Sequence, residues 1–199
     1  MNKLKSLIAA ATLGAFVGIA GHQHPHARFG AANAVTTVRV GLVALVGALI
    51  AIDADATGLW LAVVLASIAA ALDGVDGWLA RRTRLTSEFG ARFDMETDAL
   101  LILVLSILAW RHEKAGAWVL GSGLMRYAFV AAGRVLPWLA RPLRSTLRGK
   151  TVAVVQIVGL IVAVAPIIPV PSSAIVAAVT LAALVWSFAV DIVWLARQT

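Results

Sequence analysis

The chain has 199 residues, of which 61% are hydrophobic and only 14% are charged. Soluble domains carry about 25% charged residues, so the composition excludes an ordinary soluble domain and indicates an integral membrane protein. The formal net charge is +7. In a membrane protein, excess Lys and Arg sets topology and meets anionic headgroups, so we expect membrane lipids as partners and no nucleic acid.

Residues 1–29 are predicted to form a separate N-terminal hydrophobic and juxtamembrane segment with a linker. An apolar run at residues 4–20 follows Lys3 and Lys5, which is similar to the start of a signal peptide. Cleavage would tend to start the mature chain outside, against the charge pattern that follows. We therefore expect an additional helix here that spans the membrane or lies on its surface.

Six apolar segments follow, and a helix of roughly 20 such residues crosses a bilayer. They lie near residues 34–52, 57–80, 95–110, 115–133, 151–168 and 173–195. The predicted fold is all-α and integral to the membrane, a bundle of six transmembrane helices formed by residues 30–199. Polar or proline-rich breaks, including residues 81–92 and 134–150, separate the segments.

Positive charge falls on alternate connections of this six-helix path, and cytoplasmic loops are enriched in Lys and Arg. The opposite connections hold only Arg111 and Lys114, offset by Glu113. We therefore expect a multi-pass protein of the cytoplasmic (inner) membrane, with both ends of the six-helix unit facing the cytoplasm. The positive residues on that side are Arg28, Arg81, Arg82, Arg84, Arg92, Arg134, Arg141, Arg144, Arg148, Lys150 and Arg197.

Four aspartates fall within 26 residues of this apolar chain. An acidic side chain inside a span costs at least about 2.5 kcal/mol, so intramembrane carboxylates indicate function. Asp73 and Asp76 are three residues apart and Asp94 and Asp98 are four apart, so each pair shares one face of a helix. The spacing predicts a pocket in which four carboxylates converge.

Four converging carboxylates would repel one another unless cations compensate their charge. The chain has no cysteine, so thiolate sites are excluded and hard ions such as Mg²⁺ or Mn²⁺ are favoured. Such a pair of ions can clamp a pyrophosphate. Gly77 and Ala80 leave room for a ligand, and Arg81 is spaced to hold phosphate oxygens. The pattern favours phosphoryl-group chemistry, with one carboxylate as general base.

Aspartates in an apolar chain can also serve purposes other than metal binding. Aspartate is common at helix ends, where it caps backbone amides. Acidic residues in membranes also mark ion or proton transporters. Capping does not account for four carboxylates in this register, and a transport pathway does not account for the neighbouring Gly, Ala and Arg.

The stretch from Asp73 to Asp98 resembles the signature of the CDP-alcohol phosphatidyltransferases, D-x2-D-G-x2-A-R-x8-G-x3-D-x3-D, with Gly90 at its second glycine. All eight fixed positions are occupied. The resemblance covers residues 30–197 and implies six transmembrane helices with a cytoplasmic active site. It implies transfer of a phosphatidyl-type group from CDP-diacylglycerol, or a similar CDP-lipid, to an alcohol, with release of CMP.

The resemblance also implies a role for each aspartate. Asp73, Asp76 and Asp94 would ligate a two-metal centre of Mg²⁺ or Mn²⁺, and Asp98 would contact the second ion and act as general base. Asn33-Ala34-Val35-Thr36 is similar to the N-x-x-T entry of the family, although Ala32 stands where a proline is usual. The implied CDP-lipid contacts are Asn33, Thr36, Asp73, Gly77, Ala80, Arg81 and Ser87.

The acceptor alcohol is selected outside this signature. Arg126 inside a predicted span, together with Arg134 and Lys150, would suit a phosphorylated acceptor, although positive charge at the membrane surface also explains the last two. The segment around Gly149-Lys150-Thr151 and Gln156 resembles the G-K-x-K-T-x-x-Q stretch of phosphatidylglycerophosphate synthases, although Thr151 follows Lys150 directly and Gln156 lies two residues late. Glycerol 3-phosphate is therefore the first expectation. Serine and inositol phosphate stay open as acceptors, and the lipid substrate could be another CDP-alcohol with a different hydrophobic tail. A homodimer packed through helices rich in Ala and Gly also stays open.

Overall fold

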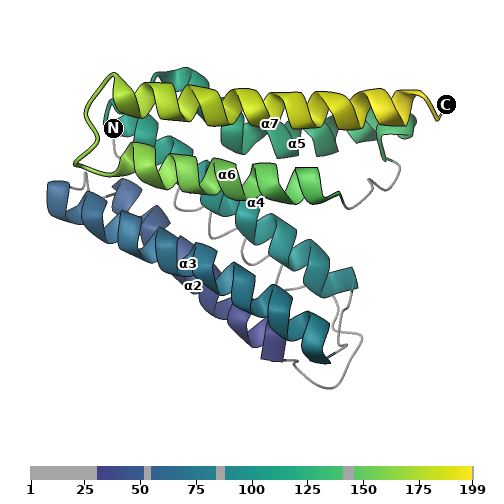
Figure 1. Cartoon of the computed structure of the whole chain (residues 1–199), viewed down its shortest axis with the longest axis horizontal. Coiled ribbons are helices and arrows are strands. Elements are labelled where there is room, and N and C mark those ends of the chain that lie inside the picture. Colours follow the sequence, from purple (N-terminus) through teal and green to yellow (C-terminus); the bar gives the residue numbers. More distant parts are fainter. Residues whose placement is uncertain (1–30, 52–54, 84–87, 141–145, 199) are drawn as a thin grey trace. The chain divides into compact units, whose positions relative to one another are not determined.

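The computed structural model describes residues 31–51, 55–83, 88–140 and 146–198. Within these ranges the chain is helical and contains no strand (Figure 1). The predicted all-α class is confirmed for this part of the chain, and the predicted N-terminal helix lies outside it. The helices are α2 (Ala31–Ala51), α3 (Ala56–Thr83), α4 (Glu88–Arg111), α5 (Leu120–Val135), α6 (Leu147–Val164) and α7 (Ser172–Ala196), with short 3₁₀ helices η1 (Ala117–Val119) and η2 (Pro137–Ala140).

Each of the six predicted segments overlaps an α helix, although the bounds differ by several residues at some ends. Among the residues that the structure describes, three segments are long and apolar enough to cross a membrane: Ala56–Gly74, Leu147–Val164 and Ser172–Ala196. Val35–Ala51 in α2 is apolar but shorter. The chain is thus a membrane protein by these spans, and the count of six crossings stays a prediction.

Two predicted breaks are wrong in extent. The break at residues 81–92 is shorter, because α3 continues to Thr83 and α4 begins at Glu88. Asp94 therefore lies well inside a helix. The break at 134–150 also ends early, because α6 begins at Leu147 rather than at residue 151. Thr146 caps this helix, since its Oγ1 accepts a hydrogen bond from the Gly149 amide at 3.1 Å.

The chain divides into two compact units, Met1–Val104 and Leu105–Thr199. In the first, α2 and α3 run side by side in opposite directions (Figure 1). Asp55 caps α3, because its Oδ1 accepts from the Gly58 amide at 2.9 Å. The core of the pair is formed by fully buried small or branched side chains, among them Val43, Val46, Ala62 and Ala66.

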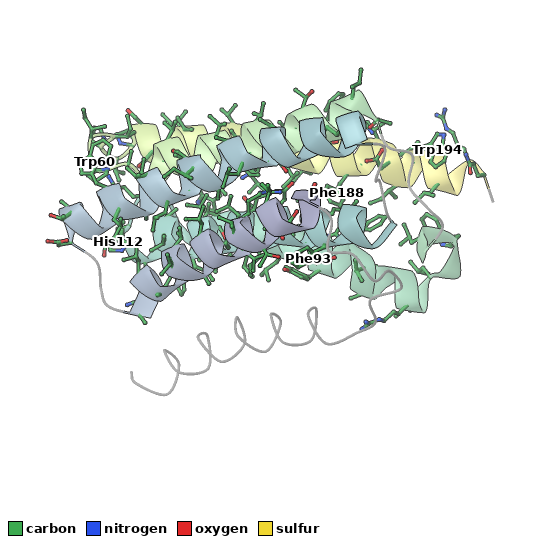
Figure 2. The ribbon with its side chains drawn as sticks, turned by 90° about the horizontal axis from the view of Figure 1, so that it is seen from below. Trp60, Phe93, His112, Phe188 and Trp194 are labelled. Carbon is green, nitrogen blue, oxygen red and sulfur yellow. The ribbon has the colours of Figure 1, made fainter. Side chains whose placement is uncertain are left out.

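In the second unit α6 packs antiparallel to α7. The Gly159 backbone on α6 approaches Thr180 on α7 so closely that an added Cβ would lie 2.4 Å from Thr180 Cγ2. Elsewhere along the same two helices, Arg148 on α6 pairs with Asp191 on α7. Phe188, labelled in Figure 2, meets Phe129 of α5 edge to face at a centroid distance of 5.7 Å. The second unit is therefore stabilised by the close packing of Gly159 against Thr180, by an ion pair and by an aromatic contact.

Candidate metal centre

Three of the four predicted aspartates converge within the first unit. Asp73 comes from α3, and Asp94 and Asp98 come from successive turns of α4. One carboxylate oxygen from each lies within 4.8 Å of the other two. The side chains of Asp73, Asp94 and Asp98 are 29%, 39% and 23% exposed, so a ligand can reach them. The structure thus brings three of the four predicted carboxylates together, and their role as metal ligands stays a prediction.

An arginine that the sequence patterns did not single out lies at the middle of the trio. Arg39 of α2 donates from Nη1 to Asp94 and from Nη2 to Asp98 at 2.5 Å, and its Nη1 is 2.9 Å from Asp73 Oδ1. Its Nε donates to the backbone carbonyl of Ala69 on α3 at 3.2 Å. The Arg39 side chain is only 1% exposed. A single buried guanidinium thus joins α2 to both aspartate-bearing helices.

A signal for Arg39 was present in the sequence. A charged residue near the centre of a span costs about 2.5–3.5 kcal/mol, which is the same physical cost that singles out the aspartates. Arg39 is also three residues after Thr36, which places both on one face of α2. Both residues are buried.

The charges of this cluster favour a cation. If ionised, Asp73, Asp94 and Asp98 carry three negative charges and Arg39 carries one positive charge, which leaves an excess of two negative charges. Each carboxylate has about four lone-pair sites on its two oxygens, so a bond to Arg39 leaves capacity for a metal. An all-oxygen donor set that is partly exposed fits hard divalent ions such as Mg²⁺ and Mn²⁺.

Other predicted residues of this site are placed only in part. The α3 backbone carries Asp76 three residues after Asp73, followed by Gly77, Ala80 and Arg81, but their side chains fall outside the described structure. The same holds for the side chain of Asn33 on α2, and all of Ser87 lies outside the described residues. Thr36 is buried on α2 one turn before Arg39. The predicted contacts of these residues with a CDP-lipid stay predictions.

The three candidate acceptor residues belong to the second unit. Arg126 is half-buried within α5, whereas Arg134 is exposed in the last turn of that helix. Lys150 is exposed in the first turn of α6, where its amide donates to the Thr146 carbonyl at 3.2 Å. Their predicted role in acceptor binding stays a prediction.

Comparison with known families decides the class of the protein. The family model for CDP-alcohol phosphatidyltransferases matches residues 29–191, which is most of the chain and includes Arg39 and the whole aspartate cluster. The chain belongs to this family. Neither the curated proteins nor the solved structures gave a match. As a CDP-alcohol phosphatidyltransferase, the chain is a membrane transferase of phospholipid synthesis that takes a CDP-alcohol and an alcohol acceptor.

Family membership also bears on the metal and on the transporter alternative. CDP-alcohol phosphatidyltransferases generally depend on divalent metal, and the trio of carboxylates could hold such an ion. The family match favours the enzyme over an ion or proton transporter, because transport requires neither the nucleotide-lipid signature nor its spacing.

Proposed function

We propose that this CDP-alcohol phosphatidyltransferase transfers the phosphatidyl group of CDP-diacylglycerol to a small polar alcohol, with glycerol 3-phosphate as the first candidate. The observation that carries the proposal is the convergence of Asp73, Asp94 and Asp98 from two helices within a chain of this family. The partners would be a CDP-lipid, the alcohol and the surrounding membrane lipids.

The reaction we propose is a single substitution at phosphorus. The acceptor hydroxyl oxygen forms a bond to the phosphorus that bears diacylglycerol, and the bond from that phosphorus to the bridging oxygen of the pyrophosphate breaks. CMP leaves with the bonding electron pair, and Asp98 accepts the hydroxyl proton. Asp98 suits this role because its carboxylate is part of the cluster and 23% exposed, so an alcohol can reach it.

The residues proposed to hold Mg²⁺ or Mn²⁺ are Asp73, Asp76, Asp94 and Asp98. When bound, such ions neutralise pyrophosphate oxygens and stabilise the negative charge that develops on the leaving CMP. The described trio supports this assignment through its oxygen donors and their mutual distances. We include Asp76 among the proposed metal ligands because it lies three residues after Asp73 on α3, which places both on the same helix face.

The CDP moiety is proposed to lie against the start of α2 and the end of α3. Thr36 supports this placement, because it lies one turn before Arg39 on α2 and Arg39 contacts the carboxylates. Gly77 and Ala80 would allow the nucleotide close approach, and Arg81 would pair with its phosphates. Asn33 and Ser87 complete the proposed pocket.

For the acceptor we propose contacts from Arg126, with Arg134 and Lys150 contributing positive charge. Arg126→Ala should raise the KM for a phosphorylated acceptor and leave the KM for CDP-diacylglycerol near its original value, because a guanidinium binds phosphate oxygens with paired donors. Arg197→Ala is the matched control, since it removes an exposed arginine after α7. Equal acceptor KM values in the Arg126→Ala protein and the original would return Arg126 to a structural role.

The proposed enzyme lies in the cytoplasmic membrane with its carboxylates toward the cytoplasm, and a homodimer fits its small-residue helices. An acceptor panel tests the proposal: purified protein, CDP-diacylglycerol and Mg²⁺ or Mn²⁺ are incubated with glycerol 3-phosphate, serine, inositol phosphate or inositol. Lipid chromatography should reveal one new phospholipid, and we expect phosphatidylglycerophosphate. A product from serine or an inositol compound would instead change the acceptor and keep the reaction class.

A further inference from the structure

Arg39 is a buried residue of α2 that connects this helix to α3 and α4. Its guanidinium contacts Asp73 on α3 and both Asp94 and Asp98 on α4, while its Nε is held by the Ala69 carbonyl. The partners on α4 are 55 and 59 residues away along the chain. The contacts therefore depend on the tertiary fold and not on local helix geometry.

The three carboxylates need a positively charged partner such as Arg39 before any metal ion binds. Three carboxylates whose oxygens lie within 4.8 Å of one another repel, and a partly buried setting strengthens that repulsion. Asp73 sits on a different helix from Asp94 and Asp98, so repulsion would tend to separate α3 from α4. A guanidinium with a planar set of donors can hold several carboxylates at once in a fixed arrangement.

We infer that Arg39 is a positioning residue of the metal centre, which holds Asp73, Asp94 and Asp98 together so that a divalent ion meets a preformed set of ligands. The inference rests on the proposed metal-dependent function. Residues that orient metal ligands typically change metal affinity by about 10–100-fold when replaced.

The same contacts would suit an opposite role, in which the guanidinium competes with the ion for the carboxylates. Two observations favour positioning. The Nε of Arg39 is anchored on a backbone carbonyl, which fixes the side chain in place. Arg39 is 1% exposed whereas its carboxylate partners are 23–39% exposed, so an ion can approach the carboxylates while Arg39 stays where it is.

The two roles predict changes of opposite sign. Loss of a nearby positive charge by itself tightens cation binding, because repulsion between like charges disappears. Loss of a positioning residue weakens binding, because the ligands are no longer held together. Arg39→Gln removes the charge and most of the donors, and Arg39→Lys keeps the charge but loses the planar fork.

The test is a titration of the metal-free, full-length protein in detergent with Mn²⁺, in which electron paramagnetic resonance reports the free ion. We expect Arg39→Gln to weaken Mn²⁺ binding at least about tenfold and Arg39→Lys to lie between this variant and the original. Arg148→Gln is the matched control, since it breaks the Arg148–Asp191 pair of the second unit, and it should bind Mn²⁺ like the original. Unchanged or tighter binding by Arg39→Gln overturns the inference.

Size-exclusion profiles and thermal melting establish that each variant is folded. Should Arg39→Gln not fold, Arg39→Lys decides: weaker Mn²⁺ binding supports positioning, and unchanged binding overturns it. The original protein separates the two hypotheses. If it binds Mn²⁺ and releases CMP while Arg39→Gln binds equally well, only the positioning role fails. If the original protein does not bind Mn²⁺, the proposed metal centre fails and the positioning role fails with it.

Discussion

Asp98→Asn changes the chemistry of the aspartate cluster with little change in shape. Asp98 Oδ1 accepts from Arg39 Nη2 at 2.5 Å, and the amide oxygen of asparagine can take over that acceptor role. The link between α2 and α4 should therefore survive the substitution. The amide cannot accept the proton of an attacking hydroxyl, because it has no basic group near neutral pH.

The expected loss follows from the worth of a general base. A positioned base contributes roughly 10²–10⁴-fold to a reaction rate, so kcat should fall by about that factor. This corresponds to about 3–5 kcal/mol of lost transition-state stabilisation. The assay measures CMP release at saturating CDP-diacylglycerol and acceptor, and a separate equilibrium measurement follows binding of the CDP-lipid, which should change much less than kcat.

Glu96→Gln provides the control for Asp98→Asn. Glu96 is a half-buried carboxylate two residues earlier on α4, and it is not among the three clustered aspartates. Its replacement should leave kcat close to the original value. A kcat for Asp98→Asn within tenfold of the original would refute the assignment of Asp98 as base, and an equal loss of CDP-lipid binding would make it chiefly a metal ligand.

Two further predictions concern the second unit. Gly159→Ala should lower the melting temperature, because the new Cβ would lie 2.4 Å from Thr180 Cγ2 and such overpacking costs about 1–3 kcal/mol. Gly121→Ala is the control: its new Cβ would meet nothing within 4 Å, so its melting temperature should equal or slightly exceed that of the original protein. If both variants melt alike, the close approach of α6 and α7 is wrong. Lys114→Met should also destabilise the protein, by about 1–3 kcal/mol, because Lys114 Nζ donates to the Ile168 carbonyl at 2.8 Å and its loss removes that bond. Unchanged resistance to denaturant in this variant would contradict that contribution.

Much of the aspartate site was predictable from the sequence. The cost of intramembrane charge singled out the carboxylates, and the four-residue spacing of Asp94 and Asp98 placed them on one helix face. The spacing could not show how far Asp73 lies from them, because that distance depends on how α3 and α4 meet. The expectation that they converge came from the two pairs on successive predicted helices, and the resemblance to the family signature agrees with it.

The helix ends and Arg39 were harder to predict, for different reasons. Hydropathy reports which residues prefer the membrane, but a helix can include polar turns beyond its apolar part. Such polar turns extend α3 to Thr83 at its end and make α4 begin at Glu88. Arg39 contacts residues that are 30 to 59 positions away along the sequence, so no local sequence pattern predicts these contacts. Its charge within an apolar segment and its position three residues after Thr36 were the sequence features that pointed to a role.

The most direct test of the proposed reaction is CMP release by the purified protein from CDP-diacylglycerol. CMP should form only when both a divalent ion and an acceptor alcohol are present, and the variant in which Asp94 and Asp98 are both replaced by asparagine should form none. Chelation should stop the reaction, and added Mg²⁺ or Mn²⁺ should restore it. Failure to release CMP with any alcohol in the panel under either ion, by protein that is folded in detergent, would contradict the account.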